Sequence, residues 1–402
     1  MGTDTSPSRG QSSAPHARDD LGPRPHPSAT RRRAPILSVM AVALGSVLVL
    51  TSTALFIGGT LLADKVESSV NRDDLLGVAT STDPPLITGP PRITGPLTFL
   101  VMGSDSRAGD NYNPETPDGS VAAVPGTPRT DTIIVVHVPR STDRAYVVSI
   151  PRDTYLPVAD SRGRPGARNK INAAFAFGGA PRLVQTLNHF TGHKIDYPVL
   201  VDFSAVREIT DLVGGVDVVI DRTSYDGYRF LPANTRYPTT PCRDTQGRKR
   251  NCLVFRKGPL HLDGQLAEYY VRQRAGLANG DLDRVKRQQQ FLRALLAKAA
   301  SANLLTNPRR FNDFVTMVGA ALTVDERMPV ASIAFSLKGV RPSDLVFMTL
   351  PTAGFDDVAG VGSVVLPDLR RSRELFAAMR AGTMDQYLMK YPAAANDVSH
   401  GP

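Results

Sequence analysis

Arginine and aspartate recur in four short clusters along this sequence, and each cluster lies beside an apolar run. The clusters are GSDSR (103–107), RTDT (129–132), PRDT (151–154) and the stretch 272–288. In alternating α/β folds ligands bind at the ends of strands, so charged side chains there are the expected site. Each Arg–Asp pair taken singly is more simply a surface ion pair, which contributes little to stability. Taken together, the clusters leave open both a phosphate-binding site and a set of structural ion pairs.

The residue types in these clusters permit phosphoryl transfer without a serine or cysteine nucleophile. The chain has no GxSxG elbow and no glycine-rich Lys-Ser/Thr phosphate loop. Asp105 and Asp131 are hard oxygen ligands of the kind that Mg²⁺ takes. Arginines could neutralise a diphosphate and spread the developing charge, and the candidates are Arg107, Arg129, Arg152, Arg272 and Arg274. Lys170 begins the apolar stretch KINAAFAFGG, where a cation is disfavoured at a helix start unless an anion binds there.

Strands and helices alternate through most of residues 97–380, which predicts helices on both faces of a mixed or mostly parallel sheet in one domain. Apolar runs predict strands at 97–103, 132–138, 145–150, 197–203, 216–220, 345–350 and 362–366. Periodic segments predict helices at 170–179, 181–190, 204–214, 263–274, 282–300, about 308–322, about 328–337 and from 368. Residues 222–262 are interpreted as irregular.

The N-terminal region predicts a membrane-anchored protein. Residues 1–34 are rich in Pro, Ser, Arg and Gly and indicate a disordered tail. Residues 35–63 carry no charge and exceed the roughly 20 apolar residues that a transmembrane helix needs. A cleaved signal is the alternative, although its apolar region is usually shorter. The arginines before residue 34 predict a cytoplasmic N-terminus and an extracellular remainder, beginning with a Pro-rich linker at 64–95.

The composition permits anionic partners and predicts one disulfide. The formal net charge is +9, and 38 of the 47 basic residues are Arg, which a GC-rich genome or phosphate recognition would explain. A DNA-binding regulator is disfavoured, because no helix-turn-helix is visible and the domain would lie outside the membrane. Cys242 and Cys252 enclose a polar turn outside the membrane, so we predict a disulfide worth about 2–3 kcal/mol rather than a metal site.

Seven motifs, in order, resemble the LytR-CpsA-Psr family. They are GSDSR, RTDTIIVVHV, VVSIPRDTYLPV, KINAAFAFGG, VDFSAVREITDLVGGVDV, LDGQLAEYYVRQR and GDLDRVKRQQQFL. The match covers about 97–300, and the remainder to about 385 looks like that domain's C-terminal portion. The resemblance implies a three-layer α/β/α fold with a central mixed sheet at 96–385, preceded by one transmembrane helix and followed by a tail at 386–402. It also implies an apolar tunnel for a prenyl chain, and the cysteine loop resembles that of actinobacterial members.

The function implied by the resemblance is that of a glycopolymer–peptidoglycan phosphotransferase. Such an enzyme takes a glycan linked by pyrophosphate to a polyprenyl lipid. It transfers the glycan with one phosphate to a peptidoglycan sugar hydroxyl, expected to be the muramic acid C6-OH, and polyprenyl phosphate leaves. A pyrophosphatase side activity is compatible with this chemistry. The alternative is a membrane-anchored binder or carrier of lipid-linked glycan without turnover.

The resemblance also implies roles for single residues. Asp105 and Asp131 resemble the ligands of Mg²⁺, for which Mn²⁺ could substitute. Pyrophosphate contacts are implied for Arg129, Arg152, Lys170, Arg272, Arg274 and Gln288. Arg107 is implied as a catalytic residue, and Asp281, Arg284 and Arg287 inside the same motifs as further pyrophosphate contacts. The group that takes the acceptor proton stays open between Asp131 and Asp153.

Overall fold

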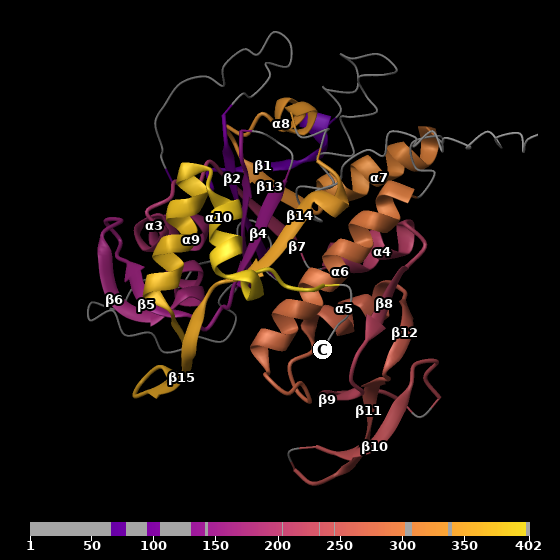
Figure 1. The fold of residues 1–402 in the computed structure, drawn as a ribbon. Coiled ribbons are helices and arrows are strands. Elements are labelled where there is room, and N and C mark those ends of the chain that lie inside the picture. The colour runs from indigo at the N-terminus through magenta and orange to yellow at the C-terminus, as the bar shows by residue number, and fades with distance from the viewer. Residues whose placement is uncertain are drawn as a thin grey trace, which may run out of the picture. The chain divides into compact units, whose positions relative to one another are not determined.

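A mixed seven-stranded sheet forms the centre of the fold (Figure 1). The computed structural model describes residues 66–77, 95–104, 130–140, 144–202, 204–232, 234–244, 246–301, 308–336 and 340–398. All of them belong to one compact unit of the chain, residues 36–402. In spatial order the strands are β1 (Asn71–Asp73), β13 (Leu322–Asp325), β7 (Tyr197–Asp202), β2 (Leu97–Ser104), β3 (Thr130–Val138), β4 (Ala145–Ile150) and β14 (Leu345–Thr349).

The sheet combines both strand directions, as the sequence predicted. The neighbours β2 and β3, and β3 and β4, are antiparallel, whereas β7 with β2 and β4 with β14 are parallel. Strand β4 is buried along its whole length, and β3 is buried from Ile133 onward. Continuous apolar runs of this kind form strands that are covered on both faces.

Helices cover both faces of the sheet and make two separate apolar cores. Alternate residues of β2 divide between the cores, because Phe99 and Val101 face one side and Leu100 and Met102 the other. The first core contains α4 (Ser204–Leu212), α5 (Gly264–Arg272), α6 (Asp281–Ser301), α7 (Pro308–Ala320) and α8 (Val330–Ser336). The second contains α3 (Ile171–Thr191), α9 (Leu369–Ala381) and α10 (Met384–Lys390). The predicted α/β/α layering is therefore confirmed.

Helix α3 is two helical segments joined at a glycine pair, which agrees with the prediction of a stop at Gly179. Gly178 and Gly179 have non-helical backbone angles, and Gly179 has a φ of 62°. Glycine adopts that conformation without the penalty that a Cβ imposes. The second segment begins at Ala180 and Pro181, where proline is tolerated in a first turn. Lys170 is the N-cap of the first segment, which has no acidic residue in its first turn.

The N-terminal boundary of the folded domain differs from the prediction. Residues 66–77, which were expected in the Pro-rich linker at 64–95, belong to the fold. Val66, Val70 and Leu75 are buried, and β1 pairs with β13 in parallel. These apolar residues precede the prolines, so the proline density of the later part concealed them. The predicted transmembrane segment lies outside the described residues, and no helix within the described part of the chain is long and apolar enough to cross a membrane.

Residues 222–262 were interpreted as irregular, and this was wrong because they form strands. Strand β12 (Gly258–Leu262) pairs with β8 (Val216–Ile220), and a separate sheet has the order β10 (Thr239–Arg243), β11 (Lys249–Phe255), β9 (Ser224–Phe230). Figure 1 shows this second sheet beyond β8 and α5, on the side away from β5 and β6. The predicted disulfide between Cys242 and Cys252 joins β10 to β11. Arginines and lysines at strand positions had obscured the alternation of apolar residues.

Two hairpins and the C-terminal segment complete the domain. The hairpins are β5 (Tyr155–Ala159) with β6 (Pro165–Lys170), and β15 (Thr352–Val358) with β16 (Gly362–Pro367). Short 3₁₀ helices occur at Pro342–Asp344 and Pro392–Ala394. The expected tail at 386–402 is part of the fold as far as residue 398, because Val398 is buried in the first core and Ala395 bridges to Met348 of β14.

Candidate active site

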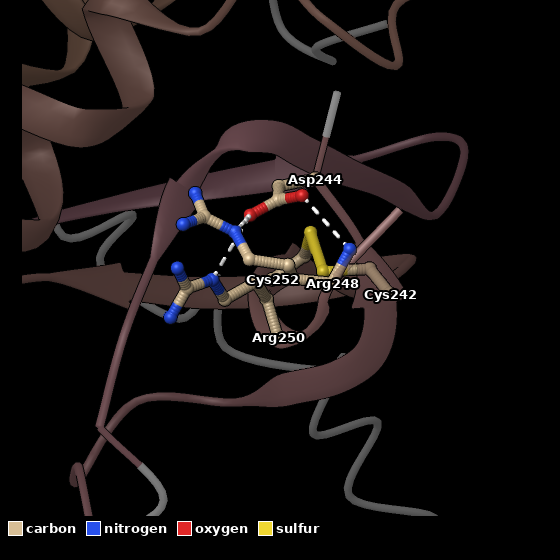
Figure 2. Close-up of a disulfide and its surroundings, with 5 residues drawn as sticks. All are labelled: Cys242, Asp244, Arg248, Arg250 and Cys252. Atoms are coloured by element: carbon tan, nitrogen blue, oxygen red, sulfur yellow. Dashed lines mark hydrogen bonds and ion pairs between the residues drawn. A yellow bond between two sulfur atoms is a disulfide. The ribbon is translucent and has the colours of Figure 1, made fainter. Parts of the chain in front are cut away.

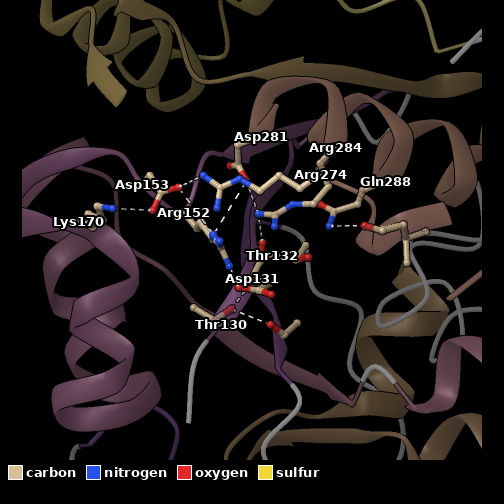
Figure 3. A network of polar contacts seen from close by, with 12 residues as sticks. Thr130, Asp131, Thr132, Arg152, Asp153, Lys170, Arg274, Asp281, Arg284 and Gln288 are labelled. Atoms are coloured by element: carbon tan, nitrogen blue, oxygen red, sulfur yellow. Dashed lines mark hydrogen bonds and ion pairs between the residues drawn. The ribbon is translucent and has the colours of Figure 1, made fainter. Parts of the chain in front are cut away.

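One edge of the central sheet brings together charged residues from distant parts of the chain. The start of β3 and the end of β4 meet there, because these strands are antiparallel and Ile133 is directly opposite Ile150. Asp131 lies at that start, and Arg152 and Asp153 directly follow that end. The first residues of α3 and α6 approach the same edge (Figure 3). We call the following set the charged centre: Asp131, Arg152, Asp153, Lys170, Arg274, Asp281 and Arg284.

Arg152 lies among the three carboxylates of the charged centre. Its Nη1 donates to Oδ1 of Asp131. Its Nε lies 3.8 Å from Asp153 Oδ2 and 3.9 Å from Asp281 Oδ1, too far for a hydrogen bond. Burial lowers the pKa of Arg152, but the charges of Asp131 and Asp153 outweigh burial and raise it overall. This arginine therefore carries a full positive charge between three carboxylates.

Asp153 links the start of α3 to the loop that follows α5. Lys170 Nζ lies 3.4 Å from Asp153 Oδ1, and Arg274 Nη2 lies 3.3 Å from Asp153 Oδ2. The Asp153 side chain is only 9% exposed, whereas that of Arg274 is 47% exposed. The carboxylate thus holds two cations in place while the guanidinium group of Arg274 still faces solvent.

Asp281 and Arg284 form a buried pair on the first turn of α6. Arg284 Nη2 lies 2.5 Å from Asp281 Oδ1, but neither oxygen of Asp281 has a partner in hydrogen-bond geometry among the described residues. Burial raises the pKa of Asp281 against the opposing charge of Arg284, and burial lowers the pKa of Arg284. Arg284 Nη2 also donates to the backbone oxygen of Asp131 at 3.3 Å, which ties α6 to β3. Burying incompletely paired charges lowers the stability of the fold. A role in packing therefore does not explain why Asp281 and Arg284 are buried.

The charged centre has more cationic than anionic groups. It contains four basic side chains and three carboxylates. The Nε atoms of Arg152 and Arg284 are buried and have no hydrogen-bond acceptor within the described residues. A bound anion would compensate this excess of positive charge, and phosphate suits guanidinium groups in particular.

Three predicted site residues lie at the margin of the charged centre or outside it. Arg287 is fully buried and donates to Gln273 and Ser224, away from the centre. Gln288 Nε2 donates to the backbone oxygen of Val271 at 3.2 Å. Arg272 Nη1 lies 3.5 Å from Glu268 Oε1, one turn earlier on α5.

Asp105, Arg107 and Arg129 lie outside the described residues, so their roles stay predictions. The sequence reasoning missed Gln273 and Ser224, which hold Arg287. The position of Gln273 between two predicted phosphate-binding arginines could have identified it as part of the site. Ser224 lies in a charged strand, and its sequence position indicated no such role.

Asp131 has the chemistry of a monodentate magnesium ligand. Its Oδ1 accepts from Arg152, and its Oδ2 makes no hydrogen bond to another described residue. The side chain is 34% exposed, which leaves this oxygen accessible. Mg²⁺ commonly takes one or two carboxylates and fills its other positions with water and substrate phosphates. No group of three or more His, Cys, Asp or Glu side chains that could hold a metal occurs in the described ranges.

Comparison with known proteins identifies relatives in cell-wall biosynthesis. A "Probable cell wall biosynthesis protein LcpB" of Corynebacterium glutamicum is 36% identical over 286 residues, covering 70% of this chain and 60% of the relative. The "Polyisoprenyl-teichoic acid--peptidoglycan teichoic acid transferase TagU" of Bacillus subtilis is 30% identical over 224 residues, covering 56% and 58%. This chain thus spans less than two thirds of the length of either relative.

A solved structure and a family model agree with these relatives. The crystal structure of protein gbs0355 from Streptococcus agalactiae has the same fold, with a TM-score of 0.54 at 19% identity, covering 72% of this chain and 89% of that one. The model described as "LytR_cpsA_psr family" matches residues 60–376, which include every residue of the charged centre. The chain therefore belongs to the LytR_cpsA_psr family.

Proposed function

We propose that the charged centre binds the pyrophosphate of a lipid-linked cell-wall glycopolymer and transfers the glycan with one phosphate to peptidoglycan. The observation that carries this proposal is the excess of partly buried positive charge at one edge of the sheet. A diphosphate is the ligand whose charge and geometry match several convergent guanidinium groups. The names of the relatives support a glycopolymer transfer role, since one is a teichoic acid transferase acting on peptidoglycan.

In the proposed reaction the acceptor sugar hydroxyl, expected to be the muramic acid C6-OH, attacks the phosphorus next to the glycan. The bond from that phosphorus to the bridging oxygen breaks, and polyprenyl phosphate leaves with the electron pair. Arg152, Lys170 and Arg274 bind the diphosphate and stabilise the charge that develops on its oxygens. A Mg²⁺ or Mn²⁺ ion at Asp131, with Asp105 as the predicted second ligand, would supply further neutralisation of charge.

The proton of the acceptor hydroxyl goes to Asp131 or Asp153. Both oxygens of Asp153 lie beside cations, at 3.4 Å from Lys170 and 3.3 Å from Arg274. Asp131 keeps Oδ2 without a contact to a described side chain. This difference favours Asp131 as the group with an open oxygen, whether that oxygen receives the metal or the proton.

The proposed location follows from the substrate and from the predicted anchor. A polyprenyl lipid resides in the membrane, so the enzyme must work at the membrane surface. We propose a single-pass protein of the cell membrane with a cytoplasmic N-terminus and an extracellular catalytic domain. The prenyl chain would occupy an apolar tunnel in this domain, and peptidoglycan would be the second partner.

The test is transfer by the full chain in detergent. The protein is incubated with Mg²⁺, a polyprenyl-pyrophosphate glycan of defined structure and peptidoglycan fragments, and products are identified by mass spectrometry. We expect a phosphodiester-linked product, and we expect Arg152→Met to lower kcat/KM by about 10²- to 10³-fold, as for loss of one preorganised charge donor. Arg373→Met is the matched control, because Arg373 is exposed on α9.

The possible outcomes separate the proposal from its alternative. A protein that retains the lipid substrate but forms no product with any acceptor would be a carrier of lipid-linked glycan. A protein that neither binds the lipid nor forms a product would refute both functions. Equal loss of activity in Arg152→Met and Arg373→Met would mean that the charged centre is not the site.

A further inference from the structure

The sheet that carries the disulfide is strongly basic. We call residues 221–257 the basic arm, which contains the strands β9, β10 and β11. These residues include nine Arg or Lys and three Asp. The charged centre contains none of them, so the proposed transfer reaction leaves this charge unexplained.

Two cations of the basic arm stand directly opposite each other. Arg243 of β10 pairs in register with Lys249 of β11, and both are exposed. Like charges in direct cross-strand register destabilise a sheet. Neither has a carboxylate partner among the described residues, although Arg243 Nη1 donates to the backbone oxygen of Gly247 at 2.7 Å. A bound anion would remove this repulsion.

The neighbouring cations Arg248 and Arg250 share one carboxylate, which distinguishes them from the opposed pair. Asp244 accepts from Arg248 Nε at 2.7 Å and from Arg250 Nε at 3.2 Å, as Figure 2 shows. The same carboxylate makes no ion pair with Arg243 or Lys249. The one acidic group near the opposed pair therefore binds other arginines. Arg243 and Lys249 remain available to an anionic ligand.

The disulfide holds the opposed pair in a fixed register. Cys242 precedes Arg243, and its bond to Cys252 joins the two strands that carry the pair. An open depression of about 530 Å³ lies here. Its lining consists of Pro241, Cys242, Arg243, Lys249, Arg250 and Asn251. A preorganised site of this kind loses little conformational entropy when it binds a charged chain.

Basic side chains occur on both faces of the arm, which favours a chain-like ligand over a flat membrane. Arg250 is directly opposite Cys242 and so lies on the disulfide face, whereas Arg243 and Lys249 lie on the other face by strand alternation. A flexible polyanion can contact both faces, and a bilayer can contact only one.

The base of the arm adjoins the loop after α5, which carries Arg274 of the charged centre. Ser224 of β9 accepts from Arg287, which also donates to Gln273, the residue between Arg272 and Arg274. Gly276 in the same loop approaches the backbone of Tyr225, where a Cβ would come within 2.0 Å of the carbonyl oxygen. Strand β11 extends about 23 Å from this base, given about 3.3 Å for each of its seven residues. A polymer bound at the charged centre can therefore continue along the arm.

From these contacts we propose that the Arg243–Lys249 pair is a binding site for the glycan chain of the donor, and that this chain is a polyanion with repeating phosphates. The proposal rests on the proposed function, because it places the donor's pyrophosphate at the charged centre. It adds a second contact far from the reacting phosphorus and specifies the chemical class of the glycan. A neutral polysaccharide would gain nothing from this pair.

The test measures binding of a fluorescent glycerol-phosphate oligomer to the full chain in detergent, with and without excess inorganic pyrophosphate to fill the charged centre. The test variant is Arg243→Thr with Lys249→Thr, because threonine favours strands and the change removes a repulsion. The control variant is Arg140→Thr with Lys194→Thr, which removes two exposed cations outside the arm. Neutral dextran oligomers and phosphatidylglycerol vesicles serve as alternative probes.

We expect the test variant to bind the oligomer about tenfold more weakly with pyrophosphate present, which corresponds to about 1.4 kcal/mol. The control variant should bind like the unchanged protein, and transfer from a donor with a single sugar should be the same in all three. Equal oligomer binding by the test and control variants would overturn the proposal. The proposal would also be overturned if the protein bound dextran as tightly as the oligomer. The same holds if the test variant lost binding only to the vesicles. If transfer fails in every protein but the difference in oligomer binding remains, only the transferase function is refuted.

Discussion

Arg287 donates a hydrogen bond to Gln273, the residue that separates Arg272 from Arg274. The guanidinium group of Arg287 also donates to Ser224 Oγ at 2.7 Å and lies over the ring of Tyr270, 4.6 Å from its centroid. A fully buried arginine thus fixes the loop after α5 that presents Arg274 to the charged centre. We infer that Arg287 is a positioning residue, although its motif had suggested contact with the substrate.

Replacement of Arg287 by Met should lower stability and weaken donor binding together. The buried polar atoms of Gln273 and Ser224 would lose the hydrogen bonds that Arg287 donates, at a cost of about 3 kcal/mol in the free energy of unfolding. Because the loop would no longer hold Arg274, KM for the donor should rise more than kcat falls. Thermal unfolding and steady-state kinetics measure both effects.

Arg293→Met is the matched control for Arg287→Met, since Arg293 is exposed on the same helix. Arg287→Lys keeps one positive charge but cannot make the forked contact, so it should restore stability more than it restores donor KM. An unchanged donor KM in Arg287→Met would leave Arg287 with a structural role only.

Stability should fall as the pH drops from about 6.5 towards 4, because of His137. Burial, together with the charge of His193, lowers the pKa of His137 from its ordinary 6.5 to about 4. The unfolded chain then binds a proton at a pH where the folded protein does not. The neutral ring therefore contributes stability above pH 6.5 that is lost through this window, up to about 3 kcal/mol. Urea unfolding at a series of pH values measures the loss.

The control for the pH dependence is His189→Gln, because His189 is exposed on α3. This variant should show the same loss of stability in acid as the unchanged protein. His137→Gln should flatten the curve between pH 6.5 and 4, with some dependence left from His193, whose pKa burial also lowers. If the free energy of unfolding of His137→Gln fell with pH as steeply as that of the unchanged protein, the assignment of this pH dependence to His137 would be wrong.

Much of the central fold was predictable because its strands are continuous apolar runs. The runs at 132–138 and 145–150 became β3 and β4, and the helix stop at Gly179 was placed correctly. Edge strands were missed because they carry little apolar signal, as β1 and β10 show. The sequence pattern of β1, Asn71–Asp73, contains no apolar residue, and only its pairing with β13 makes it a strand.

The charged centre was predictable as a set of residues, but its pairing was not. The clusters at strand ends indicated Asp131, Arg152 and Asp153 because the ends of adjacent strands meet. No spacing in the sequence distinguishes a substrate-facing arginine from a buried one, and Arg284 and Arg287 on α6 show this. Both are buried, yet Arg284 contacts Asp281 in the centre and Arg287 contacts Gln273 behind it.

Asp131→Asn should weaken metal binding while it keeps the shape of the side chain. The open Oδ2 of Asp131 would be replaced by an amide group, which is a poor ligand for Mg²⁺. We expect the Mg²⁺ concentration for half-maximal transfer to rise at least about tenfold, and EDTA to abolish transfer by the unchanged protein. Electron paramagnetic resonance of bound Mn²⁺ gives a readout that does not depend on activity. Asp357→Asn, an exposed carboxylate of β15, should bind Mn²⁺ normally, and equal Mn²⁺ binding by both variants would exclude Asp131 as a ligand.

Removal of the disulfide should loosen the basic arm locally and leave the central sheet intact. Cys242 and Cys252 join β10 to β11, and the turn between these strands ends at Arg248, followed by Lys249 and Arg250 at the start of β11. Without the covalent link the turn should open more often, because local opening depends on the stability of the segment itself. Trypsin should therefore cleave after these basic residues at least about tenfold faster in Cys242→Ser with Cys252→Ser, which corresponds to about 1.4 kcal/mol of lost local stability. Cleavage in the turn between β5 and β6, after Arg162, should keep its rate. Faster cleavage at both turns would show instead that the disulfide stabilises the whole domain, and unchanged cleavage at both would show that the strands hold the arm without it.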